Sequence, residues 1–401
     1  MRILALNCGS SSIKASVISL GDGLYEALAS ASVSALPDRP AGVIRLGEGP
    51  EEAFAVAAGA GYGEGTLALL DALASRGLLD GLEAAGHRVV HGGPRLTAPV
   101  LLSDEALAEI EAAGALAPLH NAPALEAIRA ARSRLDRTPM VATFDTSFFA
   151  ALPADASTYA IPAELRERFG IRRYGFHGLA HRYMWRRLVG LAGRDDLRAV
   201  TLQLGSGCSA AAIRSGKPAD TSMGFTPLEG LVMATRSGDI DPAIPSFLAG
   251  EGGFSPEEVE RILNERSGLL GLSGASGDIR RLLALEASGD AAATLALSVF
   301  CYRVRKYVGA YAAALGGLDA LVFGGGVGEN QPAVRERICA GFDWLGLSLD
   351  STANARTRGR DAVISSTGSR VLCCGVAVDE ARIIAEDARA CLQGQEVRDG
   401  G

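Results

Sequence analysis

Short apolar runs alternate along the chain with longer amphipathic stretches, and this pattern predicts a mixed α/β protein. Residues 2–6 (RILAL) and 13–20 (IKASVISL) are predicted strands on either side of a polar Gly/Ser segment, so the chain opens with a strand–turn–strand unit. Residues 139–144 (PMVATF) are predicted as another buried strand, which ends on Asp145. A further strand at 320–323 leads into a run of glycines.

Local signals predict two of the helices. Ser255 is an expected N-cap, because Pro256 follows at the first helical position and Glu258 lies three residues after the serine. Residues 290–315 are predicted as a long helix that stops at Gly316.

The strand–turn–strand pattern of the N-terminus is repeated in the second half of the chain. Residues 198–204 (RAVTLQL), a GSG turn at 205–207 and residues 209–214 (SAAAIR) repeat the order strand, small-residue turn, strand. The repeat fits two related lobes that each offer a phosphate-binding turn to a shared cleft. By itself it also fits chance.

Length and charge narrow the function classes. The 401 residues predict two or three domains, and 48% hydrophobic with 21% charged residues predicts a chain that folds throughout. The net charge of −7 and the lack of a basic run argue against nucleic-acid and membrane-surface partners. The longest apolar stretch, 307–318, is far shorter than the roughly 20 residues of a membrane-spanning helix. Without a secretory h-region, a cytoplasmic protein is expected.

Cysteine and glycine usage add two further expectations. Seven cysteines without a CxxC pair predict neither a disulfide framework nor a structural zinc site, and Cys373 and Cys374 are interpreted as core residues of a strand. Glycine, at 50 of 401 residues, exceeds its average usage of about 7%. The excess indicates either loose linkers or backbone brought close to a ligand.

Two segments of the first half could bind anions. Residues 7–14 (NCGSSSIK) combine hydroxyls, an amide and exposed backbone N–H groups in a tight turn, although a polar hairpin turn would look the same. In residues 86–93 (GHRVVHGG), Arg88 is a candidate bidentate partner for a carboxylate or phosphate. The alternative for Arg88 is an ion pair at the rim of the sheet.

Histidines are the next candidates. His177 and His181 have helical spacing, but no glutamate lies between them and no third ligand is apparent, which argues against zinc. We predict that His177 is an exposed catalytic or phosphate-facing imidazole and that His181 is a structural hydrogen-bonding residue on the following helix. All five histidines lie between His87 and His181. This spacing indicates one site, or else a set of local core histidines.

Phosphoryl transfer accounts for these parts together. The Gly-punctuated loop at 220–242 adds Arg236, and residues 323–330 place a glycine turn between a strand and a helix at Pro332, as nucleotide-binding turns require. The glycine turn does not separate ATP from a dinucleotide. The chain does not open with GxGxxG and has no GxxxxGK[ST], which argues against a Rossmann dehydrogenase and a P-loop NTPase. The parts that the sequence does contain are those of a phosphoryl-transfer site: phosphate-cradling turns, arginines, an imidazole and carboxylates for Mg²⁺.

The motifs resemble those of the acetate kinase family, within the sugar kinase, Hsp70 and actin superfamily. The resemblance extends from Asn7 to about Ala385 and rests on NCGSSSIK, GHRVVHGG, APLHN, FDTSF, RRYGFHG, DTSMGFTPLEG, TRSGDIDPAI, SGD before Arg280, and GVGEN. It implies an α/β fold of two actin-like (ribonuclease H-like) lobes, related by duplication, with the active-site cleft between them. The implied N-terminal lobe is 1–148 plus 384–401. The implied C-terminal lobe, 149–383, carries the nucleotide site and the dimer interface.

The resemblance also implies an activity. It is the reversible, direct in-line transfer of the γ-phosphoryl group of ATP to acetate, giving acetyl phosphate and ADP, with Mg²⁺ or Mn²⁺, in a homodimer. The implied catalytic residues are Asn7, Arg88, Asp145, His177 and Arg236. The implied acetate-binding residues are Val90, Leu119, His120, Phe176 and Pro227. The implied ATP- and phosphate-binding residues are Ser10, Ser12, Lys14, Gln203, Gly205, Ser206, Gly207, Asp278, Ile279, Arg280, Gly326, Val327, Gly328 and Asn330. The implied metal-binding residues are Asn7, Asp145 and Glu380.

One departure from the family pattern keeps two alternatives open. Where the family usually has His-Leu-Gly-Asn-Gly, residues 203–207 read QLGSG, so Gln203 and Ser206 replace an imidazole and an amide. The first alternative is a diverged acyl kinase that uses propionate or another donor such as pyrophosphate. The second is a non-catalytic nucleotide-binding protein of actin-like fold.

Overall fold

The computed structural model describes residues 1–9, 12–21, 23–114 and 118–395, with the backbone alone for 118–120. The chain divides into two compact units, which we call unit 1 and unit 2. Unit 1 comprises residues 1–150 and the C-terminal segment from Asp379, and unit 2 comprises residues 151–378. The chain returns to unit 1 just before helix α15 (Glu380–Leu392), so the expected return at residue 384 would fall inside that helix.

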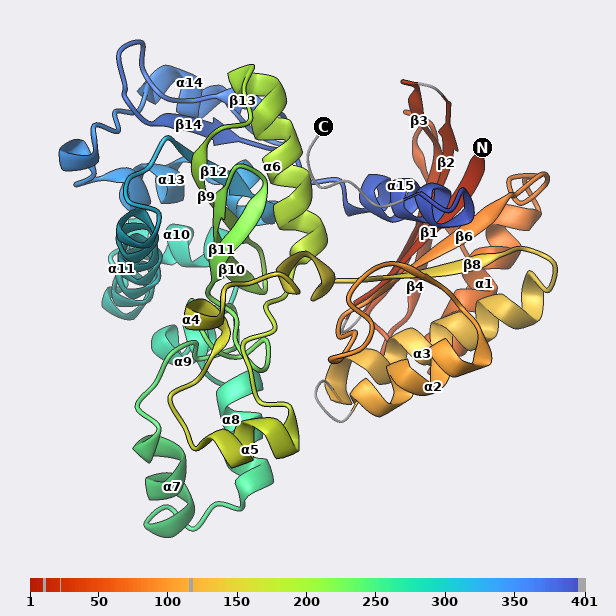
Figure 1. Cartoon of the computed structure of the whole chain (residues 1–401), viewed down its shortest axis with the longest axis horizontal. Helices are drawn as coiled ribbons and strands as arrows, with labels where there is room; N and C mark the ends of the chain where they lie inside the picture. Colours follow the sequence, from red (N-terminus) through yellow and green to blue (C-terminus); the bar gives the residue numbers. More distant parts are fainter. Residues whose placement is uncertain (10–11, 22, 115–117, 396–401) are drawn as a thin grey trace. The chain divides into compact units, whose positions relative to one another are not determined.

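Unit 1 contains an eight-stranded sheet in the order β5-β4-β3-β2-β1-β6-β8-β7. Its strands are β1 (Arg2–Cys8), β2 (Ser12–Leu20), β3 (Tyr25–Ser34), β4 (Ala41–Leu46), β5 (Glu51–Phe54), β6 (Ala84–Val89), β7 (Val100–Leu101) and β8 (Met140–Phe144). Its helices are α1 (Tyr62–Ala74), α2 (Asp104–Ala113), α3 (Pro118–Arg134), the short 3₁₀ helix Ser147–Phe149, and α15. Helices α1, α2 and α3 lie on one side of the sheet and α15 on the other (Figure 1).

The two faces of this sheet are packed differently. On the face of α1 and α3, Leu4 and Ile13 belong to one buried apolar cluster with Leu69 of α1. On the opposite face Gly86 of β6 allows close approach of α15, because a Cβ there would lie 2.5 Å from Cγ2 of Ile384. The helix α15 therefore rests on the backbone of β6, next to the carboxyl ends of the parallel strands β1, β6 and β8.

Unit 2 contains a six-stranded sheet in the order β11-β10-β9-β12-β14-β13. Its strands are β9 (Arg198–Leu204), β10 (Cys208–Arg214), β11 (Lys217–Thr221), β12 (Ala320–Gly324), β13 (Ala362–Val363) and β14 (Leu372–Gly375). Its helices are α4 (Ala154–Ser157), α5 (Ala163–Phe169), α6 (Gly178–Ala192), α7 (Ala243–Gly250), α8 (Pro256–Glu265), α9 (Gly268–Ser273), α10 (Ile279–Ala287), α11 (Ala291–Ala314), α12 (Gly325–Asn330), α13 (Pro332–Cys339), α14 (Ser351–Arg356) and the 3₁₀ helix Asp343–Leu345. Helix α6 packs on β9 and β12, and α11 packs on β9, β10 and β11.

The two sheets share one plan. Strand β1 pairs antiparallel with β2 and parallel with β6, and β9 pairs antiparallel with β10 and parallel with β12. The orders β3-β2-β1-β6-β8 and β11-β10-β9-β12-β14 therefore match. The same alternation of buried and half-buried positions runs along β1 and β9, which places Asn7 and Gln203 at the same position in their strands. These observations agree with the expected pair of related α/β lobes.

Local predictions fared differently. The cap at Ser255 is confirmed, since its side chain accepts a hydrogen bond from the first turn of α8. The long helix predicted at 290–315 is confirmed as α11, and the side chain of Asp290 caps it. The expected glycine turn after β12 is wrong, because Gly325 already begins the helix α12. Cys373 and Cys374 are core residues of β14, as predicted.

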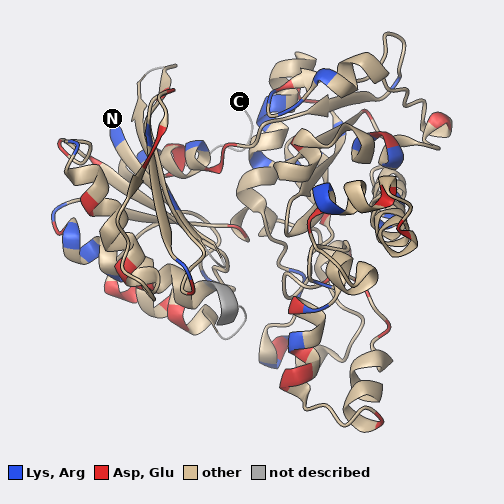
Figure 2. Ribbon diagram, turned by 180° about the vertical axis from the view of Figure 1, so that it is seen from behind, with Lys and Arg blue, Asp and Glu red and all other residues tan. Residues whose placement is uncertain are grey.

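Charged side chains of both signs are interspersed over both units (Figure 2). None of the described helices is both long and apolar enough to span a membrane. All seven cysteines are free, and burial raises the pKa of the Cys8 and Cys374 thiols to about 12. Such thiols stay protonated at neutral pH and are poor nucleophiles.

Candidate active site

The end of the unit 1 sheet gathers polar side chains from three strands. Asn7 of β1 is the register partner of Arg88 of β6, which is in turn the partner of Thr143 of β8. Side chains alternate between the faces of a strand, so Asp145, two residues after Thr143, is expected on the face of Arg88. Glu380, the first residue of α15, meets them there.

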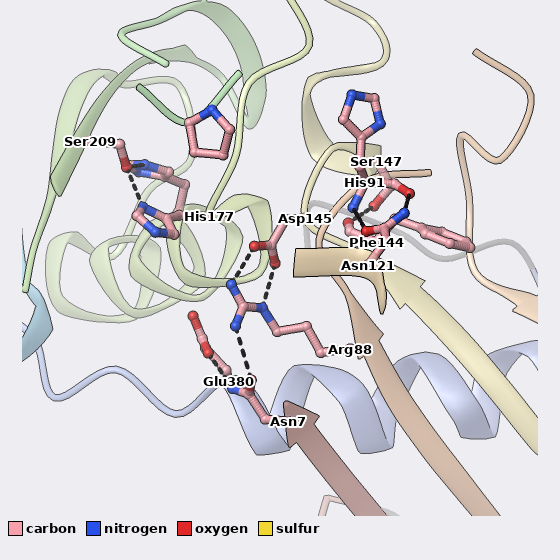
Figure 3. Close-up of polar contacts among 12 residues, drawn as sticks. Asn7, Arg88, His91, Asn121, Phe144, Asp145, Ser147, His177, Ser209 and Glu380 are labelled. Atoms are coloured by element: carbon pink, nitrogen blue, oxygen red, sulfur yellow. Dashed lines mark hydrogen bonds and ion pairs between the residues drawn. The ribbon is translucent and has the colours of Figure 1, made fainter. Parts of the chain in front are cut away.

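Hydrogen bonds join these four side chains in a row (Figure 3). Arg88 donates from Nε to Oδ1 of Asp145 at 2.9 Å, from Nη2 to Oδ2 of Asp145 at 2.5 Å, and from Nη1 to Oδ1 of Asn7 at 2.9 Å. Asn7 then donates from Nδ2 to Oε2 of Glu380 at 2.7 Å. A guanidinium has five N–H donors. Within the described part of the chain these contacts use three of them, so one on Nη1 and one on Nη2 can bind an anion.

Burial and charge oppose each other at Arg88. Asp145 is fully buried, and the side chain of Arg88 is 13% exposed. Burial alone would lower the pKa of Arg88, but the carboxylates of Asp145 and Glu380 raise it by more, so the net pKa lies above its ordinary value. The guanidinium is therefore a permanent positive charge, and its bidentate contact with Asp145 fixes its orientation.

The same row offers donors for a hard divalent cation. Asp145, Glu380 and Asn7 supply carboxylate and amide oxygens, the ligand types that Mg²⁺ prefers. No group of three or more His, Cys, Asp and Glu side chains in the described residues could enclose a metal ion. Mg²⁺ commonly binds through one or two carboxylates plus substrate phosphates and water. The donor set thus fits Mg²⁺ that is delivered with a nucleotide.

Unit 2 brings together three other predicted residues. His177 is the N-cap of α6 and has φ +59°, a left-handed conformation that is uncommon for a non-glycine residue and often marks a functional site. A Cβ on Gly207 would lie 3.4 Å from Cε1 and Nε2 of His177 and 3.7 Å from Nη1 of Arg236. The backbone of the 205–207 turn therefore runs directly beside the imidazole and the guanidinium.

Arg236 is held in the loop at 220–242. Its Nη1 donates to the carbonyl oxygen of Pro227 at 3.3 Å. Burial lowers the pKa of Arg236 from its ordinary value, with a smaller opposing effect from Cys208. An arginine remains charged at any physiological pH even so. An anion bound next to Arg236 would therefore stabilise this partly desolvated charge.

One cavity of about 460 Å³ lies within unit 2. Its lining residues are Gly205, Ser206, Ala234, Gly277, Asp278, Ile279, Arg280, Gly326, Val327, Asn330 and Gln331. Four elements contribute: the 205–207 turn, the loop at Ala234, the start of α10 and the helix α12. Ser206 also accepts, through its carbonyl oxygen, a 3.0 Å hydrogen bond from the amide of Ala234. The turn that contacts His177 thus forms one wall of the cavity.

A buried arginine holds α12 in place. Arg335 is fully buried and uses all five N–H donors, to the carbonyl oxygens of Gly328, Glu329, Asn354 and Thr357 and to the side-chain oxygen of Asn354, at 2.7–2.9 Å. Burial lowers the pKa of Arg335 to about 10. Its bonds to Gly328 and Glu329 satisfy carbonyls in a glycine-rich helix that has little intrinsic stability.

The cavity includes eight of the residues predicted to bind ATP and phosphate. These are Gly205, Ser206, Asp278, Ile279, Arg280, Gly326, Val327 and Asn330. Gly328 is buried against β12 and does not line it, and Gly207 contacts His177 and Arg236. Gln203 lies in β9, and in the described chain its buried Oε1 has no hydrogen-bond partner.

The other predicted residues divide between the units. Ser10 lies outside the described residues, as do the side chains of Leu119 and His120. Ser12 and Lys14 belong to β2, and the carbonyl oxygen of Ser12 accepts a 2.8 Å hydrogen bond from Gly9. Val90 is buried in unit 1, while buried Phe176 and half-buried Pro227 belong to unit 2.

Two histidines are core residues. His87 is 2% exposed and His91 is fully buried, and burial lowers the pKa of each to about 4. His91 accepts a hydrogen bond from the amide of Gly93 at 2.8 Å. The spacing of the five histidines in the sequence therefore did not indicate one site. His181 does lie on the helix after His177 and is hydrogen-bonded there, as predicted.

Sequence reasoning missed residues that the structure adds. Ala234, Gly277 and Gln331 line the cavity, and Ser209 contacts His177. Gly277 approaches Ala234 so closely that a Cβ would lie 2.8 Å from its carbonyl oxygen. Gln331 could have been suspected as the neighbour of Asn330, but nothing local in the sequence distinguishes Ser209.

Comparison with known proteins settles the family. The acetokinase family pattern matches residues 2–386. The chain belongs to the acetate kinase family. It is 49% identical to the acetate kinase of Solibacter usitatus over 322 aligned residues. The aligned segment covers 79% of this chain and 78% of that protein. The family assignment made from the motifs is thereby confirmed, and with it the enzyme class, a phosphotransferase that uses a carboxyl group as acceptor.

Solved structures of acetate kinase relatives have the same fold. The crystal structure of acetate kinase from Porphyromonas gingivalis is 38% identical, covers 98% of this chain and 99% of its own, and superposes with a TM-score of 0.88. A propionate kinase from Francisella tularensis is 37% identical, covers 97% and 99%, and has a TM-score of 0.90. The predicted fold class is therefore confirmed for an acetate kinase family member. As a member, the protein is an ATP-using kinase.

Proposed function

We propose that this family member catalyses the reversible transfer of the γ-phosphoryl group of ATP to acetate, giving ADP and acetyl phosphate. The observation that carries the proposal is the state of Arg88. Its side chain is anchored on Asp145 and Asn7, and two of its N–H groups are not used by the described residues. A charged fork held in this way is suited to a carboxylate or a phosphoryl group.

The nucleotide is proposed to occupy the unit 2 cavity. A volume of about 460 Å³ falls within the range of small-molecule sites. Ile279 and Val327 offer apolar contacts to a base, and Asp278 and Asn330 offer polar ones. The 205–207 turn would then receive the phosphates, since its backbone faces His177 and Arg236. Ser12 and Lys14 of β2, with Ser10, are proposed as further phosphate contacts from unit 1.

Charge neutralisation is the proposed basis of catalysis. Phosphoryl transfer to a carboxylate brings two anions together, so positive charge and in-line positioning dominate the barrier. Arg88 and Arg236 would bind the acetate carboxylate and the transferring phosphoryl group, and His177 would donate to a phosphoryl oxygen. Asp145, Glu380 and Asn7 would hold or orient Mg²⁺, which neutralises charge on the phosphates when bound.

The acyl group is proposed to contact Val90, Leu119, Phe176 and Pro227, with His120 beside the carboxylate. An acyl site formed by a valine and a phenylalanine is expected to accept a methyl group and little more. One extra methylene changes discrimination by only about 1–3 kcal/mol, so propionate is expected to be a weak substrate. The second candidate, a propionate-preferring kinase, is favoured by one finding, the likeness to the Francisella propionate kinase.

A homodimer is proposed through unit 2. The helices α5 and α7 have no buried residues, and Phe169 and Phe247 on them are 52% and 64% exposed. Exposed apolar side chains on short helices without buried residues are typical of an oligomer interface. Sedimentation of the purified protein would distinguish a dimer from a monomer. Use of ATP agrees with the proposed cytoplasmic location.

A substrate panel tests the activity. Acetyl phosphate formation would be trapped as the hydroxamate with acetate, propionate and butyrate, each with Mg²⁺ and either ATP or pyrophosphate. We expect kcat/KM to be highest for acetate with ATP. No turnover by folded protein would refute catalysis, and a preference for propionate or pyrophosphate would favour the diverged kinase. Abolition of activity in Arg88→Ala, with unchanged circular dichroism, would exclude a non-catalytic nucleotide-binding protein.

A further inference from the structure

A row of four side chains connects the interior of unit 2 to His177. Thr201 of β9 and Ser209 of β10 lie on neighbouring strands, and His181 reaches them from α6. The oxygen of Thr201 lies 2.7 Å from Nδ1 of His181, and the oxygen of Ser209 lies 2.8 Å from Nε2 of His181. Ser209 is also 2.9 Å from Nδ1 of His177 (Figure 3). Thr201, His181 and Ser209 are fully buried.

The direction of these hydrogen bonds follows from the donors at the buried end. The only hydrogen-bond partner of the Thr201 hydroxyl in the described structure is His181. If His181 donated to Thr201, the Thr201 hydrogen would be left without an acceptor, at a cost of about 1–3 kcal/mol. The favoured arrangement has Thr201 donating to Nδ1 of His181, and Nε2–H of His181 donating to Ser209. The Ser209 hydroxyl then donates to Nδ1 of His177.

This order of donors gives His177, the half-buried end of the row, a defined tautomer. Because Nδ1 of His177 accepts from Ser209, the neutral imidazole carries its hydrogen on Nε2. That nitrogen is on the side of Gly207, where a Cβ would lie 3.4 Å from it, and Arg236 is close to the same glycine. The N–H therefore lies next to the backbone of the 205–207 turn, close to the half-buried guanidinium of Arg236.

We propose that Thr201, His181 and Ser209 are positioning residues that keep His177 in its Nε2–H tautomer, so that the neutral imidazole can donate a hydrogen bond to the transferring phosphoryl group. The role of the tautomer in catalysis rests on the function proposed above, whereas the tautomer itself does not. Without the row, the opposite tautomer would present a lone pair to an anion and repel it. The row therefore extends the use of His177 to pH values at which it is uncharged.

The tautomer can be measured without any assay of activity. The chain has five histidines, so ¹⁵N-histidine labelling gives few signals, and His177→Gln assigns the one of interest. We expect wild-type His177 at pH 8 to show the Nε2–H pattern. Ser209→Ala and the near-isosteric Thr201→Val should convert it to a mixture. Ser222→Ala is the matched control, because Ser222 is equally buried but its hydroxyl oxygen accepts from Ala210. A pure Nε2–H signal in both Ser209→Ala and Thr201→Val would overturn the proposal.

Kinetics then test how the row acts on the reaction. Loss of a residue that orients a site group commonly costs about 10- to 100-fold, so Ser209→Ala should lower kcat by this factor with little change in either KM. The wild-type to variant ratio of kcat should rise with pH, since only the protonated imidazole of the variant is a reliable donor. Ser209→Thr, which keeps the hydroxyl, should restore activity. In a His177→Gln background, Ser209→Ala should change kcat less than 2-fold.

Each result has a separate meaning. A purely structural role would lower kcat equally at every pH and would lower it again in the His177→Gln background, and this outcome would overturn the proposal. If the tautomer depends on Ser209 but the protein forms no acyl phosphate from any acid, the positioning row stands and the proposed function fails. If the protein is active but His177 of the wild type is a mixture of tautomers, the proposed function stands and the positioning row fails.

Discussion

Asp145 receives both of its hydrogen bonds in the row from Arg88, one on each carboxylate oxygen, at 2.9 and 2.5 Å. Asp145 is fully buried, and the shared register of β6 and β8 brings the two residues together. The bidentate contact with Asp145 fixes the plane of the Arg88 guanidinium. It thereby sets the direction in which the remaining N–H groups of Arg88 point.

Removing the charge of Asp145 should affect stability and activity separately. Asp145→Asn leaves a buried guanidinium without its main partner, which should destabilise the fold by about 3 kcal/mol and lower kcat on the order of 10²–10³. The double variant Arg88→Met/Asp145→Leu should recover most of the stability in urea unfolding, because it removes both charges, and none of the activity. Equal destabilisation of the single and double variants would contradict this view of the pair.

Filling the space beside His177 should impair turnover without unfolding. Gly207→Ala adds a methyl group 3.4 Å from the imidazole, an ordinary contact distance, and Gly207 has no positive φ. We expect a decrease of about 10-fold or more in kcat/KM for ATP and a change below about 1 kcal/mol in stability. Gly190→Ala, a glycine of α6 with open space around its Cβ, is the control and should be fully active. Full activity of Gly207→Ala would mean that no phosphate lies there.

The buried arginine behind the cavity should control nucleotide affinity. Arg335→Lys cannot replace five hydrogen bonds, so α12 should loosen, with a loss of about 3 kcal/mol in stability and a rise in KM for ATP greater than that for acetate. The control is Arg337→Lys, because Arg337 lies with Arg335 on α13 and pairs with the partly exposed Glu286. This substitution should lower the stability by less than about 1 kcal/mol. Thermal unfolding and steady-state kinetics measure both effects. An unchanged KM for ATP would separate α12 from the nucleotide.

Acid should weaken the fold through His87. Its folded-state pKa of about 4 lies below the ordinary 6.5, because burial disfavours the charged ring. Between these values the unfolded chain binds a proton that the folded chain does not, so the unfolding free energy falls as pH decreases. The loss from this histidine between pH 7 and 5 is about 2 kcal/mol. Urea unfolding of His87→Leu should show a shallower dependence, with part remaining because His91 has a similar pKa. An unchanged slope would show that His87 is not neutral in the fold.

Trimming Val90 should widen the acyl selectivity. Val90→Ala should raise the ratio of kcat/KM for propionate over acetate by about 10-fold, the effect of one accommodated methylene. Val89→Ala is the control, because Val89 packs in the core beside Phe144 and should leave the ratio unchanged. Competition between the two acids under one set of conditions gives the ratio directly. If both variants change it equally, Val90 does not contact the acyl group.

What the sequence could predict depends on how local the signals are. The β1–β2 and β9–β10 hairpins and the cap at Ser255 were predictable because turn and capping residues act within a few positions. The helix α12, in contrast, could not be predicted from local signals. Glycines disfavour helices, and this one is held by Arg335, whose contacts with Gly328 arise only in the folded chain.

The candidate site shows the same limit. Arg88 and His177 could be singled out by residue type and neighbours, but the bidentate contact of Arg88 requires the sheet register. The buried state of His87 depends on packing that no local pattern records. Ser209 is one of many serines in the chain, and only the packing of α6 against the unit 2 sheet places it between two histidines.

The helix α15 has a consequence for synthesis of the chain. Asn7 and Glu380, which share a hydrogen bond, are 373 positions apart, and all of unit 2 is made between them. At about 5–20 residues per second, a ribosome needs roughly 20–75 s to supply Glu380 after Asn7 has appeared. During that interval the face of β6 around Gly86, later covered by Ile384, has no α15 to cover it. Folding of unit 1 is therefore completed last, by the segment that also completes the row of Asn7, Arg88 and Asp145.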